Sequence, residues 1–373
     1  MKLKIGITGQ KGFVGQNLYN TLGLFPEEFE RVDFQNSFFN DMIELNEFVN
    51  QCDVIIHLAA MNRHDDPMVI YNTNIELVRQ LISALEATNS KAHVIFSSSS
   101  QEEKNNLYGR SKHEGRKLLA EWAKGAGAIF TGLIIPNVFG PFGHPYYNSF
   151  IATFCHQLSH NEQPVIKVDG EVKLIYVGDL AKVILNEIRT GKGNELFNVN
   201  HTDERKVSEI LILLEEYKSQ YLDLGVIPPL KDIFEINLFN TFRCYLDLKN
   251  HFPVKFIQHK DPRGAFVEVI RLNVGGQVSF STTVPGITRG NHYHTRKIER
   301  FAVIKGEALI QLRKIGTNDV LDFYLSGDKP AYVDMPIWYT HNIKNTGNEE
   351  LYTIFWINEF FDSNDPDTYF ENV

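Results

Sequence analysis

The hydrophobic and polar positions of the first 22 residues predict a strand, a glycine turn and a helix in immediate succession. Residues 2–8 have the pattern of a short strand, and the spacing of Val14, Leu18 and Leu22 predicts a helix behind it. Three glycines mark the passage from strand to helix: Gly9, Gly12 and Gly15. Such a turn brings the backbone close to a ligand, and the helix N-terminus presents free N–H groups to a pyrophosphate. This segment therefore predicts a dinucleotide site.

The pattern that follows alternates between buried strands and amphipathic helices. Residues 29–33, 53–60 and 94–96 predict strands, and an apolar stripe within residues 74–85 predicts a helix. Strands that alternate with helices indicate an α/β, Rossmann-like, doubly wound parallel sheet. Its ligand site is expected at the carboxyl ends of the strands.

The pattern changes near residues 246–252, where the helical periodicity stops. Short apolar segments then alternate with glycine-containing turns, as in a small antiparallel all-β barrel. The strands are expected at residues 266–272, 277–283, 301–304 and 308–313. We therefore predict two domains, residues 1–248 and residues 249–373.

Charge and composition narrow the class of protein. A net charge of −9 over 373 residues argues against nucleic acid as the main partner, because phosphate backbones require clustered Lys and Arg. No apolar run approaches the ~18 residues that a membrane helix needs. The three cysteines (Cys52, Cys155 and Cys244) are far apart and form no metal-like pair. We therefore expect a cytoplasmic protein that acts on a small molecule.

Residues 97–112 carry a coherent set of groups for ketone reduction. A run of serines ends the predicted strand, and Tyr108 and Lys112 follow it. Hydride transfer to a ketone requires a proton for the developing alkoxide, and a tyrosine donates it more readily once its pKa of about 10 is lowered. A lysine four residues along a helix lies on the same face as the tyrosine and supplies the cation that lowers this pKa. A serine hydroxyl can hold the carbonyl oxygen.

The end of the second predicted strand bears on the choice of cofactor. An acid there binds the ribose 2′-OH of NAD, whereas a base suits the 2′-phosphate of NADP. Asp33 favours NAD, while Arg31 and Lys11 favour NADP. The local pattern leaves this choice open.

Several segments together resemble the extended short-chain dehydrogenase/reductase family over about residues 1–245. They are residues 8–15, residues 53–60, the Tyr108/Lys112 pair, residues 136–141 and residues 176–179. The resemblance implies catalytic roles for Tyr108, Lys112 and Ser99, with Ser98 as the alternative serine. Ile134 departs from the family, which often has an arginine there. The implied cofactor-binding residues are Gly9, Lys11, Gly12, Phe13, Val14, Gly15, Arg31, Asp33, Leu58, Lys112 and Asn137.

The predicted barrel contains a candidate metal site. His292 and His294 lie two apart, so they point to one face of a strand; Glu299 follows, and His341 lies further along the chain. Three histidines and a carboxylate suit one divalent ion, with zinc the first choice. The spacing resembles the two motifs of cupins, although Trp338 stands where those motifs usually have glycine.

A second resemblance overlaps this site. Residues 261–268 and 289–293 are similar to the sugar-binding motifs of nucleotide 4-keto-6-deoxy-sugar 3,5-epimerases, which are also cupins. There the histidine that matches His292 is a general base, so His292 is either a base or a metal ligand. The substrate-binding residues expected over both domains are Asn62, Arg63, Tyr147, Asn148, Arg263 and Arg289.

Both halves together resemble the bifunctional capsular-polysaccharide UDP-sugar epimerase/reductases, a resemblance that extends to residues 147–155 and 358–370. It implies C3 epimerisation of a UDP-2-acetamido-2,6-dideoxy-4-keto-hexose, followed by NADPH-dependent reduction at C4. The product would be UDP-2-acetamido-2,6-dideoxy-L-talose for N-acetyl-L-fucosamine synthesis in capsule or O-antigen. The resemblance also implies a homodimer.

Chemistry fixes the order of the two steps, since the C3 proton is acidic only while C4 is a ketone. Two alternatives remain. One is a single-activity reductase whose barrel only dimerises the protein, and the other is a sensor with an inert dehydrogenase domain. The base for C3 and the role of the metal, structural or catalytic, also stay open.

Overall fold

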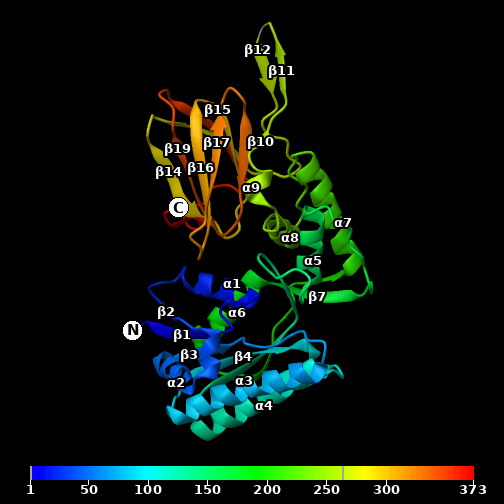
Figure 1. Cartoon of the computed structure of the whole chain (residues 1–373), viewed down its shortest axis with the longest axis vertical. Coiled ribbons are helices and arrows are strands. Elements are labelled where there is room, and N and C mark those ends of the chain that lie inside the picture. The colour runs from blue at the N-terminus through cyan, green and yellow to red at the C-terminus, as the bar shows by residue number, and fades with distance from the viewer. Residues whose placement is uncertain (1, 263) are drawn as a thin grey trace. The chain divides into compact units, whose positions relative to one another are not determined.

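The computed structural model describes residues 2–262 and 264–373, and the chain divides into two compact units (Figure 1). The first comprises Met1–Thr153 and Val168–Val207, and the second comprises Phe154–Lys167 and Ser208–Val373. None of the described helices combines the length and the apolar character that crossing a membrane requires.

A six-stranded parallel sheet organises the first unit, in the order β2-β1-β3-β4-β5-β8. Its strands are β1 (Leu3–Thr8), β2 (Phe29–Val32), β3 (Val54–His57), β4 (His93–Ser99), β5 (Phe130–Ile135) and β8 (Asn194–Asn198). Neighbouring strands are parallel throughout. The predicted Rossmann-like sheet is confirmed, and its carboxyl edge carries the glycine turn and the serine run.

Helices cover both faces of this sheet. They are α1 (Phe13–Leu22), α2 (Met42–Gln51), α3 (Pro67–Ala87), α4 (Leu107–Ala126) and α6 (Val177–Thr190), with short turns η1 (Asn36–Asn40) and η2 (Ser100–Glu103). One apolar core joins the sheet to α2, α3 and α4, and the other joins it to α1 and α6. Burial on both faces explains why the central strands have nearly continuous apolar runs.

A three-stranded sheet, β6-β7-β9, adjoins the same unit. Its strands are β6 (Asn137–Phe139), β7 (Glu171–Tyr176) and β9 (Asp203–Lys206). Further helical segments are α5 (Phe150–Ser159), α7 (Val207–Tyr217), η3 (Lys218–Asp223), α8 (Ile233–Arg243) and α9 (Leu248–His251).

The second unit contains two five-stranded antiparallel sheets around one apolar core. Their orders are β10-β18-β15-β20-β13 and β17-β16-β19-β14-β21. The strands are β10 (Val254–Lys255), β13 (Gln277–Thr283), β14 (Thr288–Tyr293), β15 (Glu299–Lys305), β16 (Glu307–Lys314), β17 (Val320–Ser326), β18 (Ala331–Met335), β19 (Tyr339–Asn345), β20 (Leu351–Ile357) and β21 (Tyr369–Phe370). The predicted antiparallel all-β architecture is confirmed.

One predicted strand, residues 266–272, is wrong over most of its length. β12 (Gly264–Val267) ends early and pairs only with β11 (Gln258–Asp261), in a hairpin that stands clear of the two sheets (Figure 1). Phe266 is 68% exposed there. Phe266 is therefore an exposed apolar residue of this hairpin, and it does not belong to a strand of the barrel.

The compact units do not divide the chain at residue 248, because the helices before that residue pack against the barrel. Arg243 donates from Nη2 to the carbonyl of Met335 at 2.9 Å, and Asn240 donates to the carbonyl of Arg296 at 2.8 Å. Residues 208–248 thus belong to the same compact unit as the barrel. The polar contacts that join them could not be predicted from the spacing of apolar residues.

Candidate functional site

The glycine turn between β1 and α1 has the geometry that a close backbone approach requires. Gly9 has a φ of +74°, and a Cβ there would lie 2.8 Å from the backbone nitrogen of Ala59. A Cβ on Gly15 would lie 2.3 Å from the carbonyl oxygen of Gly9. Gly12, the N-cap of α1, makes no side-chain cap, and the first turn of α1 contains no acid. The N-terminus of this helix therefore retains the N–H groups and the positive potential that bind an anion.

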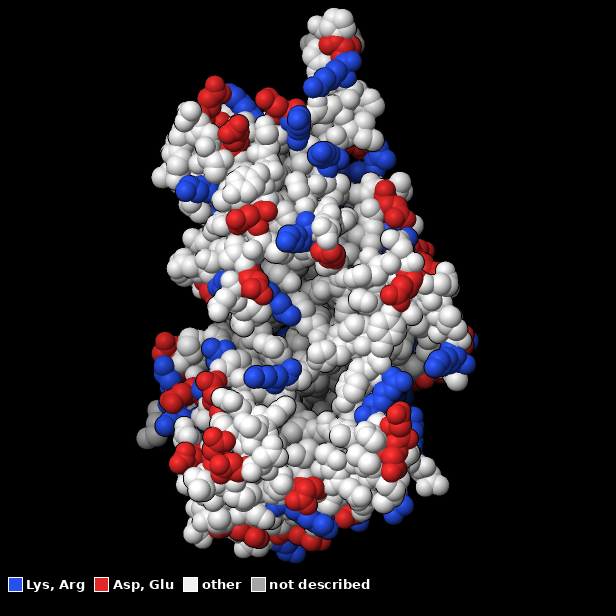
Figure 2. All heavy atoms as spheres, in the orientation of Figure 1, with Lys and Arg blue, Asp and Glu red and all other residues white. Residues whose placement is uncertain are grey.

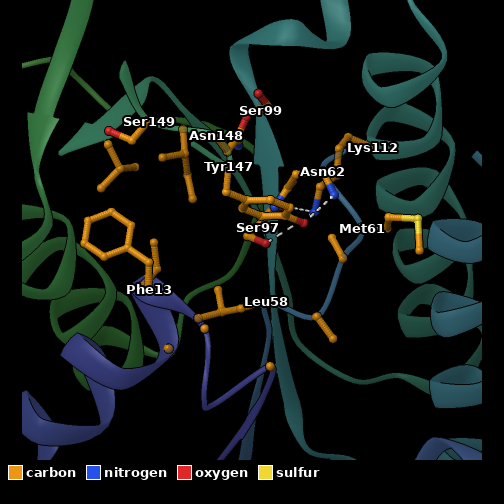
Figure 3. A pocket seen from close by; sticks show the side chains of 18 of the residues that line it. Phe13, Leu58, Met61, Asn62, Ser97, Ser99, Lys112, Tyr147, Asn148 and Ser149 are labelled. Carbon is orange, nitrogen blue, oxygen red and sulfur yellow. Dashed lines mark hydrogen bonds between the residues drawn. The ribbon is translucent and has the colours of Figure 1, made fainter. Parts of the chain in front are cut away.

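A cavity of about 690 Å³ opens at this edge of the sheet (Figure 3). Among the described residues that line it, Lys112 is the one Lys or Arg, and none is Asp or Glu. Thirteen of the predicted residues line it: Gly9, Gly12, Phe13, Val14, Gly15, Leu58, Asn62, Ser99, Tyr108, Lys112, Asn137, Tyr147 and Asn148. A cavity with this charge suits an anionic ligand such as a dinucleotide or a nucleotide sugar.

Four predicted residues of the same unit lie outside the lining. The guanidinium of Arg31 stacks over the ring of Tyr19 at 4.3 Å, and the carboxylate of Asp33 accepts a hydrogen bond of 2.8 Å from the Tyr19 hydroxyl. Arg63 donates to the carbonyl of Tyr146 at 2.6 Å, and Lys11 is exposed in the turn. Arg31 and Asp33 are therefore held by a residue of α1 that the sequence did not single out.

Three cavity-lining residues from η1 were also not predicted: Asn36, Phe39 and Asn40. They follow β2 directly and line the cavity in place of the charged residues that the sequence suggested. A polar and aromatic segment at the end of the second strand was the available signal.

Tyr108 and Lys112 lie on successive turns at the start of α4. Asn106 caps this helix by accepting from the backbone N–H of Gly109 at 2.7 Å. The ammonium of Lys112 donates to the carbonyl of Ser97 at 2.8 Å and lies 6.0 Å from the centre of the Tyr108 ring. Figure 3 shows Lys112 next to Ser97, Asn62 and Tyr147. The predicted pair is thus brought together at the end of β4.

Burial dominates the protonation of this pair. It raises the pKa of Tyr108 to about 12, with a smaller contribution from Tyr147, and it lowers the pKa of Lys112 to about 8, against the opposing effect of Glu102. The expected lowering of the tyrosine pKa by Lys112 is therefore not observed. Tyr108 is a neutral phenol at neutral pH, which is the form that donates a proton.

The hydrogen bonds of the two candidate serines differ. The hydroxyl of Ser98 donates to Glu102, a carboxylate that Arg116 binds through two bonds of 2.8 and 2.9 Å. The hydroxyl oxygen of Ser99 accepts from the backbone N–H of Gln101 at 3.2 Å, so its proton stays available for a ligand. This difference favours Ser99.

The candidate metal residues of the barrel converge. His292 lies on β14, His294 follows that strand, Glu299 begins β15 and His341 lies on β19. One potential ligand atom from each lies within 4.8 Å of the others. Nε2 of His294 and Nε2 of His341 lie 3.0 and 3.3 Å from one carboxylate oxygen of Glu299.

The protonation of these groups suits a cation. Nδ1 of His294 donates to the carbonyl of Asp367 at 2.5 Å, and Nδ1 of His341 to that of Tyr339 at 3.3 Å, so each Nε2 retains its lone pair in the neutral ring. His294 Nε2, His341 Nε2 and Glu299 Oε2 are buried without a hydrogen-bond partner. Although burial opposes both charged forms, Glu299 raises the pKa of His294, and His294 and His341 lower the pKa of Glu299, so a proton shared among these groups offsets the carboxylate's charge where no cation is bound. Such unpartnered buried atoms fit a divalent metal ion.

The other positions that the sequence singled out in the barrel are not among the four candidate ligands, and one of them lies outside the described residues. Arg289 lies exposed on β14 and donates to the carbonyl of Thr282 at 3.2 Å, and Arg263 lies outside the described residues. Trp338 takes the left-handed φ of +61° that glycine would favour, and its ring stacks on Tyr293 at 5.7 Å. Trp338 therefore adopts the backbone conformation of a glycine turn.

Two family models match the chain. The model of the NAD dependent epimerase/dehydratase family matches residues 5–200, and that of the polysaccharide biosynthesis C-terminal domain matches residues 259–369. The chain therefore belongs to the NAD dependent epimerase/dehydratase family, with a polysaccharide biosynthesis domain after it.

The full-length relatives define the type more narrowly. The chain is 32% identical over 370 residues to UDP-2-acetamido-2,6-beta-L-arabino-hexul-4-ose reductase of Pseudomonas aeruginosa, and the match covers 98% of each chain. It is 35% identical to the capsular polysaccharide assembling protein CapF of Staphylococcus aureus, with a TM-score of 0.63 and complete coverage of both chains. The RMD protein of Pseudomonas aeruginosa in complex with NADPH is 21% identical, with a TM-score of 0.53, and shares the fold over 58% of this chain. Over its whole length this is a CapF-like protein.

Proposed function

We propose that the chain reduces the C4 ketone of a UDP-2-acetamido-2,6-dideoxy-4-keto-hexose with NADPH, after epimerising C3 of that sugar. The observation that carries the reductase is the pair of half-buried Tyr108 and buried Lys112 beside the glycine turn, in a cavity whose described lining residues include no acid. The full-length similarity to a UDP-sugar reductase supports this substrate class. The product would be UDP-2-acetamido-2,6-dideoxy-L-talose for capsular polysaccharide.

Each residue of the reduction site has a distinct task. When bound, the dinucleotide supplies the hydride for C4. Ser99 donates a hydrogen bond to the carbonyl oxygen, and the Tyr108 phenol passes its proton to that oxygen as it becomes an alkoxide. Lys112, whose ammonium donates to the carbonyl of Ser97 and lies 6.0 Å from the centre of the Tyr108 ring, places a positive charge in the cavity beside the acid. The burial that raises the pKa of Tyr108 keeps the phenol protonated until this step.

Two contacts support NADPH over NADH. The Asp33 carboxylate, which would bind the ribose 2′-OH of NAD, is bound to Tyr19 and does not line the cavity. Lys11 is exposed in the glycine turn, where a 2′-phosphate can attract it.

We place epimerisation in the barrel and assign one zinc ion to His292, His294, Glu299 and His341. The buried, unpartnered atoms of three of these residues support the assignment. When bound, the cation would supply positive charge, either to hold the strands together or to favour loss of the C3 proton. Burial next to His341 and His294 lowers the pKa of His292 to about 4, so a neutral imidazole faces the other ligands.

Solvent deuterium at C3 separates this function from its main alternative. The 4-keto sugar is incubated with the enzyme in D₂O without NADPH, and NADPH oxidation is measured after its addition. Exchange at C3 followed by reduction supports both activities. Reduction without prior exchange supports a single-activity reductase whose barrel only dimerises the protein. If neither exchange nor reduction occurs, the result supports a binding protein.

We further propose that the protein is a cytoplasmic homodimer, with residues 1–248 as the reductase domain and residues 249–373 as the epimerase domain. The resemblance to the bifunctional enzymes and the three free cysteines support this. Light scattering after size exclusion tests the dimer.

On the face that Figure 2 shows, described acidic and basic side chains are interspersed, so no single sign of charge dominates there.

A further inference from the structure

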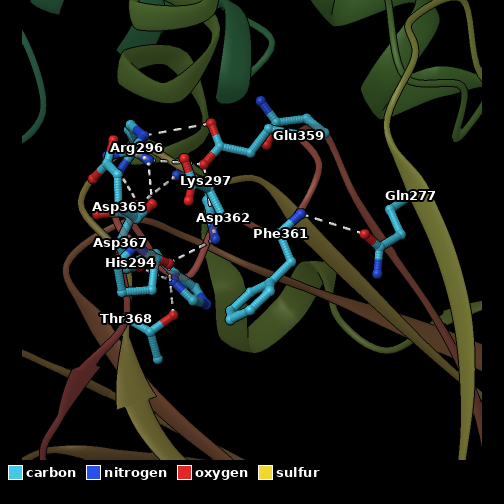
Figure 4. A network of polar contacts seen from close by, with 12 residues as sticks. Gln277, His294, Arg296, Lys297, Glu359, Phe361, Asp362, Asp365, Asp367 and Thr368 are labelled. Carbon is cyan, nitrogen blue, oxygen red and sulfur yellow. Dashed lines mark hydrogen bonds and ion pairs between the residues drawn. The ribbon is translucent and has the colours of Figure 1, made fainter.

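The loop that carries His294 is bound from outside by the C-terminal segment of the chain (Figure 4). Its anchor is Asp367, which is 2% exposed. The carboxylate of Asp367 accepts from the backbone N–H groups of Thr295, Arg296 and Lys297 at 3.0 to 3.1 Å, and from the Thr295 hydroxyl at 2.6 Å. Four donors on three successive residues fully satisfy this buried carboxylate.

The backbone of the same residue contacts the metal cluster directly. The carbonyl of Asp367 accepts the Nδ1 proton of His294 at 2.5 Å. This bond fixes the tautomer of His294 and directs Nε2 towards Glu299, 3.0 Å away. Asp367 has a φ of +41°, a conformation that Asp and Asn tolerate better than most residues. Its side chain and its carbonyl thus act on two sides of one ligand.

Neighbouring contacts hold the segment in place. β21 pairs with β14 at His292 and Tyr293, directly before His294. Arg296 binds the carboxylates of Glu359 and Asp365, and Lys297 donates to the carbonyl of Pro366 at 2.6 Å. The C-terminal segment is therefore attached both before and after His294.

We infer that Asp367 is a positioning residue of the metal site: it holds the 295–297 loop and orients His294 for the cation. The inference rests on the metal site proposed above. A metal ligand gains basicity and loses rotational freedom when its second ring nitrogen donates to a fixed acceptor. Removing the charge of Asp367 frees the loop, and with it the imidazole that must meet the ion.

The test measures zinc affinity by competition with a chromophoric chelator. Asp367→Asn keeps the size and the backbone tolerance of the side chain but removes its charge, and we expect about tenfold to a hundredfold weaker zinc binding. Asp365→Asn is the matched control: Asp365 lies two residues away, its side chain is 68% exposed and it binds only Arg296 among these partners, so its zinc affinity should equal that of the wild type. If Asp367→Asn does not fold, Thr295→Val removes a single contact to the same carboxylate and should weaken zinc binding in the same direction.

Further readouts separate positioning from general stability. The visible spectrum of the cobalt-substituted protein should change in Asp367→Asn and not in the control, because it reports ligand geometry. A purely structural role would lower the melting temperature equally with and without zinc and leave the affinity unchanged, which would overturn the inference. If the wild type itself binds no zinc, the metal site and the role of Asp367 are both refuted. If the wild type and Asp367→Asn bind zinc with equal affinity, only the positioning role of Asp367 is refuted and the metal site stands.

Discussion

Lys112 should make dinucleotide binding depend on pH between about pH 7 and pH 9. The residue is 3% exposed, and burial lowers its pKa to about 8. With that pKa, about 90% of the lysine is charged at pH 7 and about 10% at pH 9. Since Lys112 is the one Lys or Arg among the described residues that line the cavity, its charge should decide how well an anionic dinucleotide binds.

The expected effect follows from the fraction of competent protein. If only the charged form binds, the apparent Kd equals the intrinsic Kd divided by the charged fraction. The Kd for NADPH should therefore rise about tenfold between pH 7 and pH 9. His57, Tyr108 and Glu102 do not titrate in this window, because burial lowers the pKa of His57 to about 3 and raises that of Tyr108 to about 12, and Arg116 holds the pKa of the Glu102 carboxyl below its usual range despite burial.

The assay is a fluorescence titration of NADPH at pH 7, 8 and 9 with three proteins. The wild type and Lys117→Met should show the tenfold rise, because Lys117 lies exposed on the same helix. Lys112→Met should bind more weakly at pH 7 and show a flat profile. A rise of the same size in Lys112→Met would refute the assignment of the pH dependence to this lysine.

Three further predictions concern the two sites. Tyr108→Phe should bind NADPH but reduce the C4 ketone about a hundredfold more slowly, and near-normal turnover would exclude Tyr108 as the acid. Tyr19→Phe should free the Asp33 carboxylate and lower the kcat/KM preference for NADPH over NADH about fivefold, whereas an unchanged ratio would dissociate Asp33 from the choice of cofactor. A chelator should lower the melting temperature; deuterium exchange at C3 then persists if the metal is structural and stops if it is catalytic. Elemental analysis that finds no metal would contradict both roles and favour His292 as the base.

The parts that the sequence predicted correctly depend on local spacing. Gly9 and Gly12 between β1 and α1, with Gly15 in the first turn of α1, fix the turn, and apolar runs buried on both faces fix the parallel strands. His292 and His294 share a strand face by the two-residue period, and His341 lies opposite His292 because β14 and β19 pair in that register. Chemical type supplied the rest of that prediction, since His and Glu belong to the small set of residues, with Cys and Asp, that bind zinc.

The parts that could not be predicted depend on contacts between distant segments. The spacing that places Asp33 at the end of β2 is correct, yet a tyrosine from α1 binds its carboxylate. Phe266 has the side chain of a core strand, but its hairpin pairs with nothing except itself. Trp338 breaks the expected glycine pattern and still adopts the left-handed turn, because its ring is buried against Tyr293. In each case tertiary packing decides which of several locally allowed arrangements forms.

Burial explains why the chemistry of both sites was harder to predict than their position. Spacing on a helix suggested that Lys112 lowers the pKa of Tyr108. Burial instead acts on both groups: it raises the pKa of Tyr108 and lowers that of Lys112, and so favours the neutral form of each. In the barrel, the same loss of solvent leaves ring nitrogens and a carboxylate oxygen without partners, at a cost of about 1–3 kcal/mol for each such group. A protein retains such groups when a ligand satisfies them, so the unpartnered atoms among these histidines fit a cation.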